Sequence, residues 1–268
     1  MEKQAHPSFS EQPVAADTAE QKSSEPRGYL LLGGGAEFGG QMALADRRAI
    51  DLAGGFDAPL CIVPTAAAPD QNHQRAGANG ERWFRSLGAK QVTVVPLIDQ
   101  ASANEAAIAN ILRHSRLIYL LGGFTGYLAQ TLAGSASWAA ILDAYAAGAV
   151  IAGSSAGAMV LCQYYFDPAR KQVAPGLGLL PNACVLPHYN TFGKGWVARL
   201  LAALPEAVLV GIDERTGLLD DGPQGRQTGW RVYGQGKVTL YHQDTPAIYP
   251  SGASFTERWT PHRRSEET

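Results

Sequence analysis

The fold is decided by residues 149–159, which read AVIAGSSAGAM. The first four residues form an unbroken apolar run, which is typical of a strand that is covered on both faces of a parallel sheet. The run leads into the pattern G-x-S-x-G at residues 153–157, and a helix-like segment follows. A serine between small neighbours at a strand-to-helix turn is the pattern of a nucleophile elbow. We therefore predict an α/β fold in which Ser155 lies exposed at the carboxyl edge of the sheet, the alternative being a plain turn of small residues.

Five other short apolar runs are expected to be strands of the same kind: residues 29–32, 60–63, 92–96, 117–121 and 208–212. Helix-like stretches lie between them, at residues 41–52, 74–87, 104–112, 127–132 and 138–145. Alternating strands and helices predict a mostly parallel sheet with helices on both faces. The expected architecture is a three-layer αβα sandwich.

One α/β domain is expected over residues 28–249. The stretch 1–27 is polar and has almost no large apolar side chains, so it predicts a disordered tail. Two apolar runs, 230–233 and 237–241, flank the sequence Gly-Gln-Gly and predict a C-terminal β-hairpin. The stretch 250–268 is expected to be a flexible extension.

The overall charge excludes several classes of partner. The 268 residues include 22 Lys and Arg against 24 Asp and Glu, a net charge of −2, which argues against a nucleic-acid or anionic-membrane binder. We expect no membrane span and no signal peptide, because the apolar runs are short and the N-terminus is polar. Cys61, Cys162 and Cys184 show no C-x-x-C spacing and are expected to be buried thiols of a cytoplasmic protein. The sequence shows no cluster at metal-ligand spacing, so neither a metal nor another cofactor is expected.

Glycine is unusually frequent, with 30 residues, and clusters directly after predicted strands. The clusters are residues 33–35, residues 122–123, and Gly153 with Gly157. The first belongs to GGGAEFGG at residues 33–40, which fails the dinucleotide spacing G-x-G-x-x-G and lacks a phosphate-loop lysine. We interpret it as a tight turn that lines the edge of a pocket.

A nucleophilic serine needs a base and a group that orients the base. His188 ends an apolar run, which would place it at the same sheet edge as Ser155. After the run 208–212, either Asp213 or Glu214 could hold the imidazole. An esterase of the α/β-hydrolase type would instead use the chain order Ser155, then Asp220 or Asp221, then His242.

Backbone amides beside Ser155 are expected to bind the oxyanion of the reaction. Ala156 follows the serine at a helix start, and Gly123 or Phe124 would supply the second donor. Gly35, Thr125 and Asn190 are predicted to contact the substrate, because they lie in the loops at this edge.

These segments together resemble the cyanophycinase/dipeptidase E family of serine peptidases. The matching strings, in the family's order, are GGGAE at 33–37, GG at 122–123, GSSAGA at 153–158, PHY at 187–189 and GIDERT at 211–216. The resemblance implies a class I glutamine-amidotransferase-like fold. It also implies Ser155 as nucleophile, His188 as general base and Glu214 as the orienting acid. Glutamine amidotransferases of this fold carry a cysteine where this chain has Ser155, so glutaminase chemistry is not expected.

The implied substrate is a short peptide with an aspartyl residue at the cleaved bond. The chain departs from the family at Phe124 and Thr125, where Asp or Gly and then Gln or Asn are usual, and its basic cluster after the histidine is reduced to Lys194 and Arg199. The substrate thus stays open among α-aspartyl dipeptides, β-aspartyl dipeptides and aspartate–arginine polymer. A further alternative is a small-molecule-binding protein without catalytic activity. If the chain associates with itself, a homodimer is the expected form.

Overall fold

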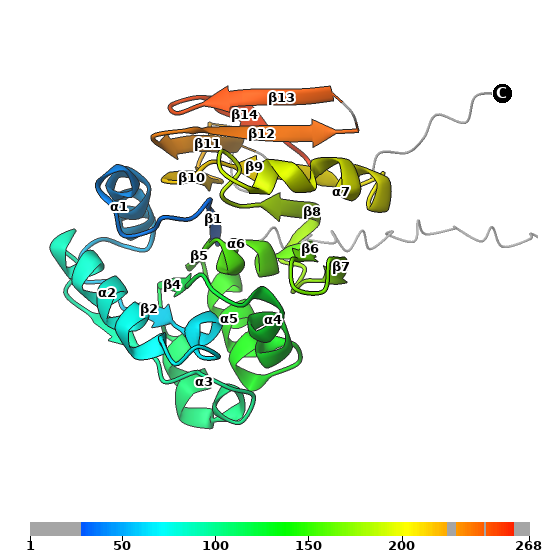
Figure 1. Cartoon of the computed structure of the whole chain (residues 1–268). Helices are drawn as coiled ribbons and strands as arrows, with labels where there is room; N and C mark the ends of the chain where they lie inside the picture. The colour runs from blue at the N-terminus through cyan, green and yellow to red at the C-terminus, as the bar shows by residue number, and fades with distance from the viewer. Residues whose placement is uncertain (1–27, 224–228, 244, 260–268) are drawn as a thin grey trace, which may run out of the picture.

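The computed structural model describes residues 28–223, 229–243 and 245–259. Its core is an eight-stranded sheet with the strand order β14-β11-β10-β1-β5-β4-β2-β3 (Figure 1). Five strands are parallel: β1 (Tyr29–Gly33), β2 (Leu60–Val63), β3 (Val92–Val94), β4 (Leu117–Leu120) and β5 (Val150–Ser154). Three antiparallel strands extend the sheet at one side: β10 (Thr216–Leu219), β11 (Gly229–Gly234) and β14 (Ser254–Thr256). The predicted disordered tail, residues 1–27, lies outside the described residues.

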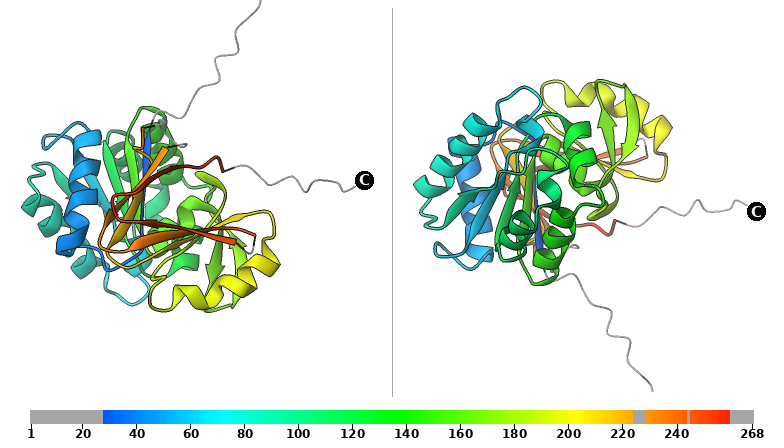
Figure 2. Two further views of the ribbon diagram at one scale, coloured as in Figure 1. Left: turned by 90° about the horizontal axis from the view of Figure 1, so that it is seen from above. Right: turned by 90° about the horizontal axis from the view of Figure 1, so that it is seen from below.

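Helices cover both faces of this sheet, as the views along its edge show (Figure 2). One layer holds α1 (Ala43–Leu52) and α2 (His73–Ser86). The other holds α3 (Ala106–Arg113), α4 (Thr125–Leu132), α5 (Ala136–Ala146) and α6 (Ala156–Leu161). Successive residues of β1 alternate between the layers, because Leu31 packs in the cluster of α1 and α2 while Leu30 and Leu32 pack in the other cluster.

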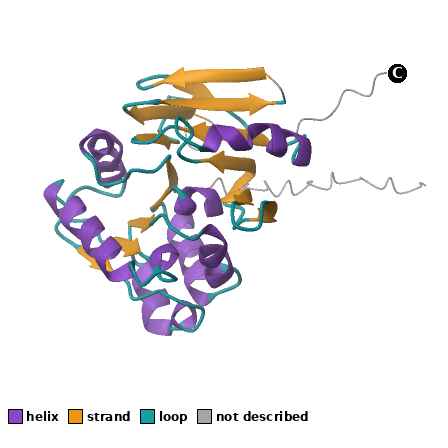
Figure 3. Cartoon of the chain, viewed as in Figure 1, coloured by secondary structure: helices purple, strands orange, loops and turns teal. Residues whose placement is uncertain are grey.

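A second sheet of six strands packs beside the central one, in the order β13-β12-β9-β8-β6-β7 (Figure 3). Its strands are β6 (Cys162–Asp167), β7 (Gln172–Pro175), β8 (Leu180–Leu186), β9 (Val208–Ile212), β12 (Lys237–His242) and β13 (Thr245–Pro250). Helix α7 (Val197–Ala203) follows the 3-10 turn η4 (Gly193–Trp196) between β8 and β9. The strand β9 was expected in the central sheet, but an unbroken apolar run indicates burial on both faces and not which sheet the strand joins.

The predicted hairpin between 230–233 and 237–241 is wrong, because β11 and β12 belong to different sheets. The chain crosses between the sheets at Gly234, whose φ is +100°, and the amide of Gly236 donates to Thr216 Oγ1 at 2.9 Å. A Cβ on Gly234 would lie 2.2 Å from the carbonyl oxygen of Arg215, so these glycines serve a close crossing and not a two-residue turn. The C-terminal hairpin is formed instead by β12 and β13, paired from Lys237↔Pro250 to His242↔Thr245.

The expected flexible extension is also corrected where the structure describes it. Ser254–Thr256 forms β14 and pairs with β11. Trp259 is only 5% exposed, and its ring meets that of Trp230 edge-on with centroids 5.2 Å apart. Residues 250–259 therefore close the edge of the central sheet. Across the described part of the chain, no helix combines the length and apolar character that crossing a membrane requires.

Candidate active site

Ser155 lies on a strained turn between β5 and α6. Its backbone has φ +50° and ψ −112°, a conformation that non-glycine residues rarely adopt. A Cβ on Gly153 would lie 2.4 Å from the carbonyl carbon of Gly157, and one on Gly157 would lie 2.2 Å from the carbonyl oxygen of Leu120. The two flanking glycines are thus required by close backbone contacts, as the elbow pattern predicts.

The structure brings Ser155, His188 and Glu214 into one hydrogen-bonded chain. His188 Nε2 lies 3.0 Å from Ser155 Oγ, and His188 Nδ1 lies 2.7 Å from Glu214 Oε1. The three residues follow the carboxyl ends of β5, β8 and β9, so both sheets contribute to the site. A carboxylate at Nδ1 holds the proton on that nitrogen and leaves Nε2 free to accept the serine proton.

The two acids left open by the sequence have different environments. Asp213 is buried, and its Oδ2 accepts a hydrogen bond from the Lys237 amide at 3.1 Å. Glu214 instead faces His188, and its own amide donates to Asn190 Oδ1 at 2.9 Å. The structure therefore places Glu214 beside the imidazole, while Asn190, predicted to contact substrate, holds the loop that carries Glu214.

The first glycine cluster connects the segments of the site. Its carbonyl groups accept hydrogen bonds from the amides of three site segments: Gly33 from Ser155 at 3.0 Å, Gly34 from His188 at 2.6 Å, and Gly35 from Arg215 at 2.9 Å. The sequence suggested only a pocket edge here. The structure shows a shared backbone platform that fixes the elbow, the histidine and the turn after Glu214.

Gly35, another predicted substrate contact, lies directly against the imidazole ring. Its φ is +109°, and a Cβ there would lie 2.3 Å from His188 Cε1 and 2.5 Å from His188 Nε2. A Cβ on Gly34 would lie 2.1 Å from the Asp213 carbonyl oxygen. Both positions need glycine because other parts of the site occupy the space that a side chain would fill.

The candidate oxyanion donors differ in their availability. Ala156 is the first residue of α6, where an amide has no partner within the helix. The Phe124 amide, by contrast, donates to the Ala66 carbonyl at 2.8 Å, so it is committed and the prediction for Phe124 is corrected. The amide of Gly123 remains the candidate for the second hydrogen-bond donor to the oxyanion. Its neighbour Gly122 lies so close to the elbow that a Cβ there would be 3.2 Å from Ser155 Cβ.

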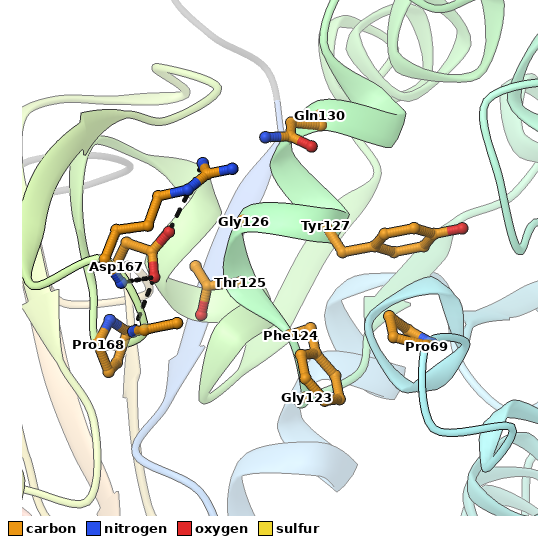
Figure 4. Close-up of a pocket in the computed structure, with 11 residues that line it drawn as sticks. Pro69, Gly123, Phe124, Thr125, Gly126, Tyr127, Gln130, Asp167 and Pro168 are labelled. Atoms are coloured by element: carbon orange, nitrogen blue, oxygen red, sulfur yellow. Dashed lines mark hydrogen bonds and ion pairs between the residues drawn. The ribbon is translucent and has the colours of Figure 1, made fainter.

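A pocket of about 430 Å³ opens beside this glycine loop (Figure 4). Phe124 and Thr125 line it from the start of α4, Asp167 lines it from the end of β6, and Arg170 lines it from the turn that follows. Thr125 Oγ1 donates to Met159 Sδ at 3.6 Å, so the threonine faces both α6 and the pocket. Asp167 and Arg170 form an ion pair at 3.8 Å, in which the guanidinium is exposed at the rim and the carboxylate is largely buried behind it. Asp167 Oδ1 also accepts hydrogen bonds from the amides of Ala169 and Arg170.

The alternative triad is not assembled. Asp221 Oδ2 accepts hydrogen bonds from Arg48 Nε at 2.6 Å and from the Tyr233 hydroxyl at 2.7 Å. Asp220 Oδ1 accepts one from the Leu30 amide, and His242 Nε2 lies 2.8 Å from Glu257 Oε2. Each predicted partner is held elsewhere, whereas Ser155 Oγ bonds His188.

Two acidic residues, Glu37 and Asp46, were not recognised from the sequence as part of the surroundings of the Ser155 turn. Glu37, in the first glycine cluster's segment, accepts a hydrogen bond from Ser154 Oγ at 2.8 Å. Asp46 is fully buried and accepts one from Trp83 Nε1 at 2.7 Å. Burial raises the pKa of Asp46 to about 7, opposed by the Trp83 hydrogen bond and assisted by the charge of Glu37. A carboxylate as the second residue after the three glycines 33–35 is the sequence signal for Glu37.

The cysteines are free and buried, as expected. Burial raises the pKa of Cys162 and raises that of Cys184 to about 12, so both stay as unreactive thiols near neutrality. Within the described residues, no group of three His, Cys, Asp or Glu side chains is arranged to hold a metal ion.

Comparisons with known proteins relate this chain to peptidases. The model of peptidase family S51 matches residues 29–227. A cyanophycinase from Geminocystis herdmanii (strain PCC 6308) is 30% identical over 206 residues, which cover 71% of this chain and 73% of that protein. A cyanophycinase from Synechococcus elongatus is 28% identical over 218 residues, covering 76% of this chain but 62% of that protein.

Two solved structures support the fold. The crystal structure of a peptidase from an acI-B1 actinobacterium superposes with a TM-score of 0.76 at 29% identity, and the match covers 87% of this chain and 98% of that one. A putative peptidase E protein from Listeria monocytogenes EGD-e superposes with a TM-score of 0.52 at 19% identity over 83% of this chain and 98% of that one, which is a likeness of fold alone. The predicted class I glutamine-amidotransferase-like α/β fold is thereby confirmed.

Proposed function

Because the chain belongs to peptidase family S51 and is a hydrolase of the serine-peptidase type, we propose that it cleaves a small aspartyl-containing peptide through an acyl-enzyme on Ser155. The observation that carries the proposal is the hydrogen-bonded chain from Ser155 Oγ through His188 to Glu214, at 3.0 and 2.7 Å. These distances lie in the range that proton transfer from a nucleophile to its base requires.

In the first half of the reaction, Ser155 Oγ attacks the carbonyl carbon of the scissile amide while His188 Nε2 takes the hydroxyl proton. Glu214 stabilises the imidazolium, and the amides of Ala156 and Gly123 donate to the oxyanion. The C–N bond then breaks, and His188 gives its proton to the leaving amine. In the second half His188 takes a proton from a water molecule, whose oxygen attacks the ester carbonyl carbon. The bond from that carbon to Ser155 Oγ then breaks, His188 returns the proton to Oγ, and the acid product leaves.

The aspartyl part of the proposal rests on two observations. Curated relatives that match most of this chain carry the name cyanophycinase. The pocket beside the glycine loop also presents the Arg170 guanidinium, which can pair with a substrate carboxylate, near the Asp167 carboxylate, which can accept a substrate amine. An aspartyl residue with a free amino group carries both a carboxylate and an amine, so it could pair with Arg170 and Asp167 in this pocket.

The test is hydrolysis of α-aspartyl dipeptides, β-aspartyl dipeptides and aspartate–arginine polymer by the intact protein. Ser155→Ala and His188→Ala are each expected to lower kcat by about 10⁴-fold or more, since residues of a triad act as a unit. His242→Ala, which removes the base of the alternative triad, is the matched control and should keep wild-type turnover.

Labelling with a fluorophosphonate separates an enzyme from a binder. The wild-type protein should be labelled at Ser155, and His188→Ala should be labelled far more slowly because the serine has lost its base. Folded wild-type protein that resists labelling would count for a binding protein that uses this fold without catalysis.

A further inference from the structure

An exposed aromatic ring covers the candidate general base. The ring of Phe192 stacks on the imidazole of His188, with centroids 4.8 Å apart and planes inclined by 22°. The Gly35 backbone lies against the same imidazole, so the ring is held between glycine and phenylalanine. Yet 53% of the Phe192 surface is open to solvent, which is a large exposure for an apolar residue in direct contact with a catalytic group.

Phe192 begins a row of three aromatic side chains that we name the aromatic strip: Phe192, Trp196 and Phe166. Centroids are 5.6 Å apart between Phe192 and Trp196, and 5.0 Å apart between Trp196 and Phe166. Trp196 is partly exposed, and it comes from the same turn after β8 that follows His188. Phe166 is only 3% exposed, so the strip runs from the exposed Phe192 beside His188 to a buried ring at its far end.

The far end of the strip is cationic. Lys171 and Arg199 line a hollow of about 290 Å³ together with Phe166 and Trp196. The Arg199 guanidinium lies 5.8 Å above the centre of the Phe166 ring, and it donates to the Lys171 carbonyl at 3.1 Å. These charges disfavour a cationic side chain on the strip and favour an anionic group, such as the carboxylate at the end of a peptide.

Proton transfer fixes which half of the substrate meets the strip. In the proposed mechanism His188 Nε2 hands its proton to the leaving amine, so the amine must come within hydrogen-bond reach of that nitrogen. The side chain on the leaving residue then extends past the imidazole, where Phe192 lies. The pocket beside the glycine loop is lined by Gly123 and Phe124 and serves the acyl half instead.

We infer that Phe192 and Trp196 form the subsite for the residue on the leaving side of the cleaved bond, and that this subsite selects an aromatic or large apolar side chain over arginine. The inference rests on the proposed serine-peptidase function and names the substrate class of the same site. Stacking on Phe192 and Trp196 removes apolar surface of both partners from water, which is the source of the preference.

The experiment compares kcat/KM for Asp-Phe, Asp-Gly and Asp-Arg. The wild-type protein should prefer Asp-Phe to Asp-Arg by about tenfold or more, the scale that an apolar subsite gives. Trp196→Ala, which leaves the stack on His188 in place, should reduce the preference several-fold. Phe192→Ala should nearly abolish it and also lower turnover of Asp-Gly, because the imidazole loses its cover. Ile248→Ala, at an exposed position on β13, is the matched control and should change neither rate nor preference.

A second readout does not depend on an aspartyl substrate. Free phenylalanine should slow fluorophosphonate labelling of the wild-type protein more than free arginine does, and Trp196→Ala should lose this protection. The inference would be overturned if neither amino acid slowed labelling, or if Phe192→Ala and Trp196→Ala both kept the preference for Asp-Phe over Asp-Arg. Either result would leave the proposed function standing. Absence of labelling in folded protein would overturn the proposed function and the inference with it.

Discussion

At the scale of single residues, the site depends on positions where a side chain is forbidden as much as on those where one reacts. Gly35→Ala should lower kcat by about 100-fold, because the new Cβ would fall 2.3 Å from His188 Cε1 and turn the imidazole away from Ser155. Gly54→Ala is a matched control: its φ of +112° gives the same backbone strain, and a Cβ there meets only Ala58 at 3.9 Å. Both substitutions should lower the melting temperature to a similar extent. Measuring kcat and the melting temperature for both variants therefore separates the effect on His188 from the effect on backbone strain. Equal kcat values for the two variants would show that Gly35 serves only the backbone.

The same residues show which parts of the site could be predicted from the sequence. Ser155, His188 and Glu214 were predictable because each follows a buried apolar run, and strand ends in such folds meet at one edge. The contact between Gly35 and His188 joins positions 153 residues apart, and no local pattern encodes it. The pairing of the Phe124 amide with Ala66 was hidden for the same reason.

At the scale of elements, apolar runs predicted strands well but not their partners. The parallel strands β1 to β5 were recognisable from their short apolar runs, although β3 at the sheet edge is only partly buried. By contrast, β9 joined the second sheet and β11 turned away from β12. Gly-Gln-Gly has the composition of a hairpin turn, yet here it carries the chain from one sheet to the other. Short edge strands such as β14 have three residues and a single buried side chain, Phe255, which is too little signal for a prediction.

The strand β14 and the residues after it should contribute measurably to stability. Trp259→Ala should lower the free energy of unfolding by about 3 kcal/mol, because it removes a buried ring from Trp230 and leaves a cavity. Trp259→Phe should cost much less, since Trp259 Nε1 is buried without a hydrogen-bond partner among the described residues. Denaturant unfolding measures both, with Phe56→Ala at an exposed position as control. A Trp259→Ala variant as stable as that control would mean that this segment does not hold the sheet edge in solution.

At the scale of the whole molecule, the acid behind the elbow couples stability to pH. The pKa of Asp46 is raised from 3.8 to about 7 by burial in the folded state. Between these values the folded protein binds a proton that the unfolded chain has lost. The free energy of unfolding therefore falls as pH rises, by about 1.4 kcal/mol per pH unit, and levels off above pH 7.

Asp46→Asn removes this titration, while its amide oxygen can still accept the hydrogen bond from Trp83 Nε1. The variant should therefore gain stability over the wild type steadily from pH 4 to pH 7 and keep a constant advantage above that. Chemical unfolding of the wild type and the variant from pH 4.5 to 8.5 measures the difference. A difference that does not change with pH would show that Asp46 titrates near its ordinary value, and hence that water reaches the space behind the elbow.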